Sequence, residues 1–238
     1  MSLFTPSCLD DFLINKQEER ELLELILDRK LPFPFNGKSG ILLHGTYGTG
    51  KSTLGFLLPS LLETAYAGKY PQTSPIGQMV ATEEAIPEVF RCGGGLSSTT
   101  IVKEINICNS RTPIHHYGQT DYFVFDEVDK LTVSAQQSLK SVMDLKRCQF
   151  IFTTNYIDRI DDGIINRSHL IEMNQHSNGN SYVIIGQSIL KKLSLPSTAM
   201  PVSHITAIAQ KAKGSLRTFS SNLIVDAIKL GGVVPPTT

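Results

Sequence analysis

The sequence has no excess of charge of either sign, because 22 lysine and arginine residues stand against 22 aspartate and glutamate residues in 238 positions. This balance excludes a basic field over the whole molecule. A nucleic-acid partner would therefore have to meet a local patch, or a surface built from several subunits. An ordinary soluble protein without a nucleic-acid partner fits the charge equally well.

Paired cysteines of the kind that bind zinc are also missing. None of the four cysteines stands in a C-x-x-C pair or has a histidine at metal-ligand spacing; they are Cys8, Cys92, Cys108 and Cys148. This pattern is typical of buried free thiols in a reducing compartment. The sequence thus argues against a zinc site.

Long hydrophobic runs are the third absence. No stretch reaches the roughly 18 consecutive apolar residues of a transmembrane helix. The N-terminal segment "MSLFTPSCLDDF" has no basic region followed by an apolar run, so it does not resemble a signal peptide. We therefore expect no membrane partner and a cytoplasmic protein, in the host cytosol if a phage or virus encodes it.

The stretch "GTYGTGKS", Gly45 to Ser52, satisfies the phosphate-binding pattern G-x-x-x-x-G-K-[ST]. An apolar run before it predicts a strand and an amphipathic stretch after it predicts a helix, which is the context of a P-loop. These flanks disfavour the alternative, a glycine-rich surface turn. We predict that ATP is bound by Gly45, Thr46, Tyr47, Gly48, Thr49, Gly50, Lys51, Ser52, Thr53 and Asp126.

Within this set, each kind of group has its own task. Backbone N–H groups and the helix N-terminus face the phosphates, and Lys51 adds a positive charge on the outer ones. The hydroxyl of Ser52 is a ligand for Mg²⁺. ATP and Mg²⁺ are therefore the predicted cofactors.

The stretch "FVFDEVDK" brings two acids to the end of a second apolar strand. In open α/β sheets, ligands bind at the carboxyl ends of the strands. Asp126 is predicted to hold Mg²⁺ through its water shell, since Mg²⁺ binds through few carboxylates and keeps its waters. Glu127 is then free to polarise an attacking water. Together with the P-loop, this pair favours a hydrolase over a small-molecule kinase.

Three further polar residues complete the predicted catalytic set of Glu127, Lys51, Asn155, Arg167 and Arg217. Asn155 ends the apolar run "FIFTTN", where its amide could bond the water or the outer phosphate. Arg167 precedes a short strand and is predicted to act as an arginine finger on a neighbour's nucleotide. Arg217 stands in the first turn of a helix, where a bound anion would offset the unfavourable cation. A solvated arginine is the open alternative there.

The order of elements predicts an α/β fold. Apolar residues make up 41% of the chain, enough for a sizeable core. Short apolar runs begin at 40, 88, 121, 148 and 168 and alternate with helical patterns at 16–30, 51–67, 97–107 and 134–145, which indicates a parallel sheet covered by helices. Pro59 is expected to kink or shorten the helix at 51–67.

After residue 178 the pattern changes to amphipathic helices only, at 181–193, 202–213 and 215–230. We predict two domains: a P-loop ATPase core over residues 1–177 and a small all-α lid over 178–238. The lid would be a three-helix unit that ends in a frayed tail.

These motifs, in this order, resemble those of the AAA+ ATPases, and most of all the clamp-loader group, the small subunits of replication factor C and their phage counterparts. "DEVDKLTVSAQQSLKSVMD" looks like that family's extended Walker B segment, and "GSLRTFSSNL" looks like its lid motif. "TTNYIDRIDDGIINRSHLIEM" looks like the stretch that runs from the family's sensor asparagine to its finger arginine, here Asn155 to Arg167. The segment "TPSCLDDFLINKQEE" resembles the run that borders the adenine. The likeness covers nearly the whole chain, to about residue 230.

The departures from the family pattern are specific. The family's "SRC" is "NRS" here, which keeps Arg167 without its flanks, and the P-loop lacks the usual prolines, where Thr46 and Tyr47 stand instead. After the predicted lid we expect no counterpart of the helical collar that joins clamp-loader subunits. Assembly is then expected to rest on the ATPase domains or on partner chains.

The resemblance implies other AAA+ subunits, DNA and a sliding clamp as partners. The family contacts DNA phosphates with helix N-termini and small polar residues inside a ring or spiral. The candidates here are the Ser97–Thr100 cluster and Ser134, which would position a duplex without reading its sequence. A role as helix caps alone is the competing interpretation.

Several functions remain open from the sequence. The first is a clamp-loader-like ATPase in DNA replication, encoded by a phage or plasmid. Alternatives are a helicase loader or transposition regulator, a small-virus superfamily 3 helicase, and a scaffold that binds ATP without hydrolysing it. Retention of both Glu127 and Arg167 argues against the scaffold.

Overall fold

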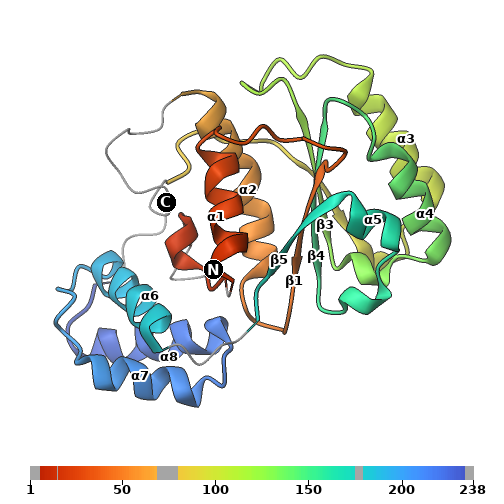
Figure 1. Cartoon of the computed structure of the whole chain (residues 1–238). Coiled ribbons are helices and arrows are strands. Elements are labelled where there is room, and N and C mark those ends of the chain that lie inside the picture. Colours follow the sequence, from red (N-terminus) through yellow and green to blue (C-terminus); the bar gives the residue numbers. More distant parts are fainter. Residues whose placement is uncertain (1–5, 15, 69–79, 175–178, 234–238) are drawn as a thin grey trace.

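The computed structural model describes residues 6–14, 16–68, 80–174 and 179–233. Its centre is a five-stranded parallel sheet in the order β2-β3-β4-β1-β5. The strands are β1 (Gly40–His44), β2 (Glu88–Arg91), β3 (Asp121–Asp126), β4 (Cys148–Thr154) and β5 (Ser168–Glu172). In Figure 1, α1 (Gln17–Leu27) and α2 (Lys51–Tyr66) cover one face of the sheet, while α3 (Ser98–Asn109), α4 (Val133–Val142) and α5 (Asp162–Asn166) cover the other. The predicted α/β fold is confirmed.

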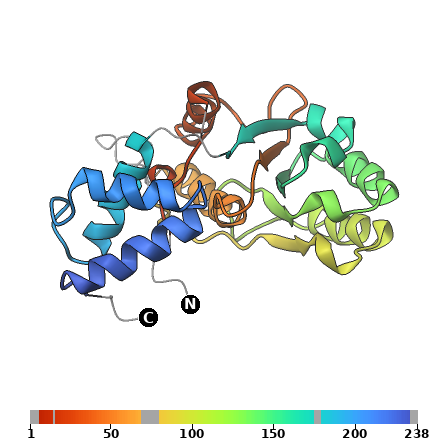
Figure 2. The same ribbon diagram turned by 90° about the horizontal axis from the view of Figure 1, so that it is seen from below.

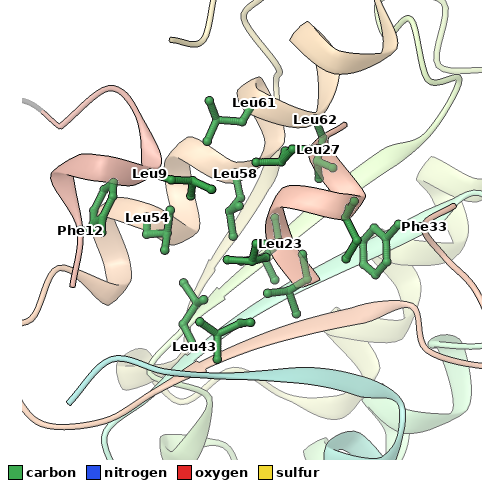
Figure 3. Close-up of a cluster of buried hydrophobic side chains, with 14 of the residues drawn as sticks. Leu9, Phe12, Leu23, Leu27, Phe33, Leu43, Leu54, Leu58, Leu61 and Leu62 are labelled. Atoms are coloured by element: carbon green, nitrogen blue, oxygen red, sulfur yellow. The ribbon is translucent and has the colours of Figure 1, made fainter. Parts of the chain in front are cut away.

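Alternation along the strands divides the core between these two faces. In β1, Leu43 joins the cluster under α1 and α2, whereas Leu42 joins the cluster under α3 and α4. Successive side chains of a strand point to opposite faces, so strands that are apolar throughout must be covered on both sides. Figure 3 shows the first cluster, in which leucines of α2 meet Leu23 and Leu27 of α1 above Leu43.

The helix after the P-loop is not shortened by its proline. α2 is continuous from Lys51 to Tyr66 with Pro59 buried inside it, so the expected shortening was wrong. An interior proline costs about 3 kcal/mol. Burial of one leucine side chain contributes about 1.5–3 kcal/mol, and α2 buries Leu54, Leu58, Leu61 and Leu62. Tertiary packing therefore outweighs the proline.

The caps of the helices on the second face differ in part from those predicted. Ser97 caps α3 by accepting a hydrogen bond from the amide of Thr100 at 3.2 Å, as expected. Ser134 does not cap α4; Thr132 does, by accepting from the amide of Ala135 at 3.2 Å. The helix begins one residue earlier than predicted because both residues are good caps and the first of them has the extended backbone that a cap needs.

The C-terminal part consists of α6 (Gly179–Lys192), α7 (Val202–Lys211) and α8 (Leu216–Lys229). These helices form a cluster of their own around Phe219 and Leu223. Figures 1 and 2 show them beside the sheet rather than over it. The predicted division between residues 177 and 178 and the end of the predicted tail, at 234–238, lie outside the described residues.

A buried carboxylate joins the N-terminal segment to these helices. Asp11 is the last residue of the 3-10 turn η1 (Leu9–Asp11), and its side chain is 0% exposed. It accepts hydrogen bonds from Ser188 Oγ at 2.9 Å, from the amide of Ser7 at 2.8 Å and from Lys192 Nζ at 3.0 Å. Leu13 nearby packs into the helical cluster. The N-terminal segment is thus held against the lid helices.

None of the helices in the described part of the chain combines the length and the hydrophobicity that a bilayer crossing requires.

Asp11→Ala should lower the free energy of unfolding by about 1–3 kcal/mol, because three partly buried donors, one of them the ammonium of Lys192, lose their buried acceptor. The measurement is chemical denaturation of the two variants and the wild type. Asp158→Ala, at an exposed acid, is the matched control and should stay within about 0.5 kcal/mol. Equal stability of all three proteins would contradict this role of Asp11.

Candidate functional site

The P-loop joins β1 to α2 and depends on glycine at its ends. Gly45 has φ 141°, and a Cβ there would lie 2.6 Å from the carbonyl oxygen of Met173. Gly50, the residue that caps α2, has φ 94°. Side chains are strained at such angles, so these positions require glycine. The loop ends where the free N–H groups of α2 begin, which is the geometry of an anion site.

Lys51 is folded back over this loop. Its Nζ donates to the carbonyl oxygen of Gly45 at 2.9 Å and to that of Thr46, and the side chain is largely buried. Burial lowers the pKa of Lys51 to about 8, although Asp126 and Asp129 act in the opposite direction. An ammonium group held in this position is close to the loop that would hold phosphates.

Asp126, at the end of β3, joins the end of β4 to the first turn of α2. Ser52 Oγ and Thr153 Oγ1 each donate to Asp126 Oδ1 at 2.7 Å. Thr153 also accepts from the amide of Glu127 at 3.0 Å. A hydroxyl and a carboxylate side by side are the hard oxygen donors that Mg²⁺ prefers, so Ser52 and Asp126 fit that ion. Among the residues described, no group of three histidine, cysteine or acidic side chains forms a metal cluster.

Glu127 lies directly after β3 with a left-handed backbone, φ 60°. Such a conformation is uncommon for residues other than glycine and clusters at functional sites. The carboxylate is partly exposed and forms an ion pair with Lys130. Since both partners face solvent, the pair is a weak restraint, and Glu127 can exchange it for another contact.

Asn155 follows β4, between two residues that are both fixed. Thr154 Oγ1 donates to Asp129 Oδ1 at 2.7 Å and accepts from the amide of Tyr156 at 3.0 Å. Because β4 lies between β3 and β1 in the sheet, Asn155 stands between the end that carries Asp126 and the P-loop.

Arg167 lies just before β5, at the amino ends of the parallel strands and thus opposite the carboxyl ends that carry the P-loop. Its backbone carbonyl accepts hydrogen bonds from the amides of Ser39 and Gly40, at the start of β1. The guanidinium pairs with Asp144 at 3.0 Å and donates to the carbonyl of Gly163 at 3.3 Å. The structure thus separates Arg167 from its own P-loop by the length of a strand.

Arg217 is near the P-loop, on the lid side. It is exposed in the first turn of α8, and its amide donates to the carbonyl oxygen of Gly48 at 3.2 Å. A cavity of about 280 Å³ lies at this junction. Its lining consists of Pro6, Phe12, Gly48, Gly50, Thr53, Leu216, Arg217 and Ser220.

The structure therefore brings together most of the predicted site. The P-loop, Asp126, Glu127 and Asn155 share the carboxyl edge of the sheet, and Arg217 borders the loop from α8, whereas Arg167 stands apart. The residues that sequence reasoning missed are Thr153, Thr154, Asp129, Tyr156, Asn174 and Leu216. Phe12 lies in the segment that the family resemblance placed beside the adenine, although the residue itself was not predicted. The polar ending "TTN" was the available signal for the two threonines.

Comparison with known proteins agrees with the family resemblance. Replication factor C subunit 3 of Arabidopsis thaliana is 26% identical over 232 residues, which is 90% of this chain and 62% of that protein. The replication factor C small subunit of Sulfolobus acidocaldarius is 26% identical over 169 residues, 70% of this chain and 45% of that protein. The chain thus spans about half to three fifths of the length of these relatives. It matches no protein-family model.

Among solved structures, the RuvB Holliday junction branch migration motor of Thermotoga maritima superposes with a TM-score of 0.64 at 14% identity, covering 98% of this chain and 69% of that one. At this identity the likeness concerns the fold alone. The chain has the AAA+ fold, a parallel P-loop sheet with helices toward its C-terminus, and resembles replication factor C small subunits in sequence.

Nucleotide affinity should fall as the pH rises through about 8. The pKa of Lys51 is about 8 in the free site, and bound phosphates would raise it by favouring the ammonium form. The affinity for nucleotide is then highest below the pKa of the free site and falls above it, by roughly tenfold between pH 7 and pH 9. Titration with a fluorescent ATP analogue measures this. Lys51→Arg, which stays charged, is the control that should remove the slope. An equal slope in both proteins would assign it to another group.

Proposed function

We propose that this protein is a Mg²⁺-dependent ATPase of the clamp-loader type. The observation that carries the proposal is the junction at Asp126, where Ser52 of the P-loop and Thr153 of β4 donate to one carboxylate oxygen, with Glu127 next to it. A P-loop serine, a metal-binding acid and a second acid for water are the parts that ATP hydrolysis needs. The similarity to replication factor C subunits supports the same reading.

Each residue has a separate task in the proposed reaction. Lys51 and the amides of the P-loop hold the phosphates, and the cavity lined by Phe12 and Leu216 receives the base. Ser52 and Asp126 would hold Mg²⁺, which supplies charge neutralisation on the β- and γ-phosphates when bound. Glu127 orients and polarises the attacking water. Asn155, at the adjacent strand end, bonds that water or the outer phosphate.

Arg167 is proposed to complete the site of a neighbouring subunit. β1 has 5 residues, so the two edges of the sheet are roughly 15 Å apart. Arg167 lies at the amino edge, beyond the reach of its own nucleotide, and is held partly exposed by Asp144. A finger that acts in trans needs an accessible and preoriented guanidinium of this kind. The proposed assembly is accordingly a ring or spiral of AAA+ subunits.

DNA is the proposed occupant of that assembly. α3 and α4 pack against each other, and both follow strands of a parallel sheet, so their N-termini lie at the same edge. Thr99, Thr100 and Ser134 are exposed there. Free N–H groups and small hydroxyls contact phosphates without reading bases. Such contacts reconcile DNA binding with a net charge of zero.

The remaining parts of the proposal follow from the same family likeness. The ATPase core would comprise residues 1–177 and the lid 178–238, with Arg217 of the lid sensing the bound nucleotide. The protein would act in DNA replication in the cytoplasm, with a sliding clamp as partner. A phage or viral origin belongs to this proposal as well.

Glu127→Gln should lower the ATP turnover number by roughly 10²–10⁴-fold, because the amide no longer polarises water. Nucleotide binding should persist, and the protein should retain ATP. Lys51→Ala should instead lose nucleotide, since the charge on the phosphates is removed. Steady-state hydrolysis and equilibrium binding separate the two effects. Turnover by Glu127→Gln at the wild-type rate would show that another group activates the water.

Arg167→Ala should retain nucleotide and lose hydrolysis by roughly 10³-fold or more. Arg111→Ala, at an exposed arginine just beyond α3, is the matched control. Mixing Arg167→Ala with Lys51→Ala should restore part of the turnover, because one intact finger then faces one intact P-loop. A mixture as inactive as its components would count against a finger in trans.

Hydrolysis measured with primer–template DNA, with and without a candidate sliding clamp, decides among the DNA-associated functions. Stimulation that requires both identifies clamp loading. Stimulation by DNA alone favours a helicase loader or a transposition regulator. Electron microscopy with an ATP analogue and the same DNA would show the assembly. Absence of any DNA effect would remove DNA from the proposal.

A further inference from the structure

Three consecutive residues at the tip of the P-loop are each attached to a different element. The amide of Thr46 donates to Asn174 Oδ1 at 2.8 Å. The hydroxyl of Tyr47 donates to the hydroxyl of Tyr156 at 2.7 Å. The carbonyl of Gly48 accepts from the amide of Arg217 at 3.2 Å. Thr46 and Tyr47, which the sequence leaves without a physical reason, therefore have defined partners.

The strand order explains why these partners are within reach. β1 lies between β4 and β5, so the residues that follow β4 and β5 flank the loop that follows β1. Asn174 comes just after β5, and Tyr156 just after β4. The loop tip is consequently held from both sides of its own strand. Of the three contacts, the one between the tyrosines joins the P-loop tip to the loop that carries Asn155.

Tyr156 is fixed by more than the tyrosine pair. The rings of Tyr47 and Tyr156 meet edge to face, with centroids 6.2 Å apart, and the guanidinium of Arg159 lies 4.1 Å above the ring of Tyr156. The amide of Tyr156 bonds Thr154, which bonds Asp129. The two sequence neighbours of Asn155 are thus both held in place: Tyr156 is bonded to the P-loop, and Thr154 is bonded to the segment after β3.

Exposure indicates that the pair is not part of the core. The side chain of Tyr47 is 61% exposed, so little apolar area is buried by it, and folding does not require a tyrosine there. The phenol is long enough to reach the loop after β4. The hydrogen bond to Tyr156 raises the pKa of Tyr47, which keeps the hydroxyl protonated as a donor. A glycine-rich loop gains order from such a tether, because its backbone has the most freedom to lose.

We propose that Tyr47 and Tyr156 form a tyrosine bridge that keeps the P-loop tip and the loop carrying Asn155 in a fixed relative position. Both are positioning residues: they act on the reaction through Asn155 and the phosphates. The inference deepens the proposed ATPase function and rests on it for its effect on turnover. The coupling between the two loops is a property of the nucleotide-free protein and can be measured without turnover.

Hydrogen–deuterium exchange on the nucleotide-free full chain tests the coupling. Tyr47→Phe and Tyr156→Phe should each accelerate exchange in both loops, 45–50 and 155–160, and the double variant should exchange no faster than either single one. Tyr182→Phe is the matched control, because in the described part of the chain the buried Tyr182 hydroxyl has no hydrogen-bond partner. Effects confined to the loop that carries each substitution, or no effect at all, would overturn the tyrosine bridge.

Kinetics test the positioning role. Each phenylalanine variant should lower the turnover number by roughly two- to tenfold, the range expected for one hydrogen bond, while the dissociation constant of an ATP analogue changes less than about twofold. Faster exchange with an unchanged turnover number would make the pair merely structural and overturn the positioning role. If the wild-type protein hydrolysed no ATP, the proposed function would be wrong instead. The exchange data alone would still decide whether the tyrosine bridge exists.

Discussion

The hydrogen bonds that Ser52 and Thr153 donate to one oxygen of Asp126 are the contact on which the candidate site depends. They join the helix after β1, the end of β4 and the end of β3 at one point. This junction is possible only because β4 lies between β3 and β1 in a parallel sheet, which brings the carboxyl ends of all three strands to one edge. Polar residues distant in sequence thereby become neighbours.

The strands can deliver these groups because their own side chains are almost entirely apolar. Phe123, Phe125, Phe150 and Phe152 are fully buried on the face under α3 and α4. Burial on both faces leaves each strand end as the first place where a polar side chain can reach solvent or ligand. The left-handed backbone of Glu127 is held at such an end, where the bond from its amide to Thr153 fixes the turn. Core packing and site geometry are thus consequences of one sheet.

Periodicity and motif spacing were enough to predict the α/β sheet, the P-loop and the helices near the C-terminus, because each depends on local patterns. The short α5 and the continuity of α2 through Pro59 were not predictable in this way. Both rest on tertiary packing that outweighs local preference. The contact of Thr153 with Asp126 and the tyrosine pair needed the strand order as well. Sequence reasoning identified Lys51, Ser52, Asp126 and Glu127, and it missed the threonine hydroxyls of β4 and the aromatic rings around them.

The two arginines of the predicted site lie in opposite relations to the P-loop, and this contrast bears on how such a site would be completed. Arg217 belongs to the first turn of α8, and its amide donates to the carbonyl of Gly48 at the loop tip, so a shift of the lid helices would displace the loop as well. Arg167 stands at the amino edge, a full strand length away, on a turn fixed by Asp144 and Gly163. In the proposed assembly, the P-loop with Arg217 would form one half of a shared site, and the outward-facing Arg167 of a neighbouring chain would form the other half. Identical or similar chains stacked edge to edge would bring the two halves together, which is the geometry that the proposed ring or spiral requires.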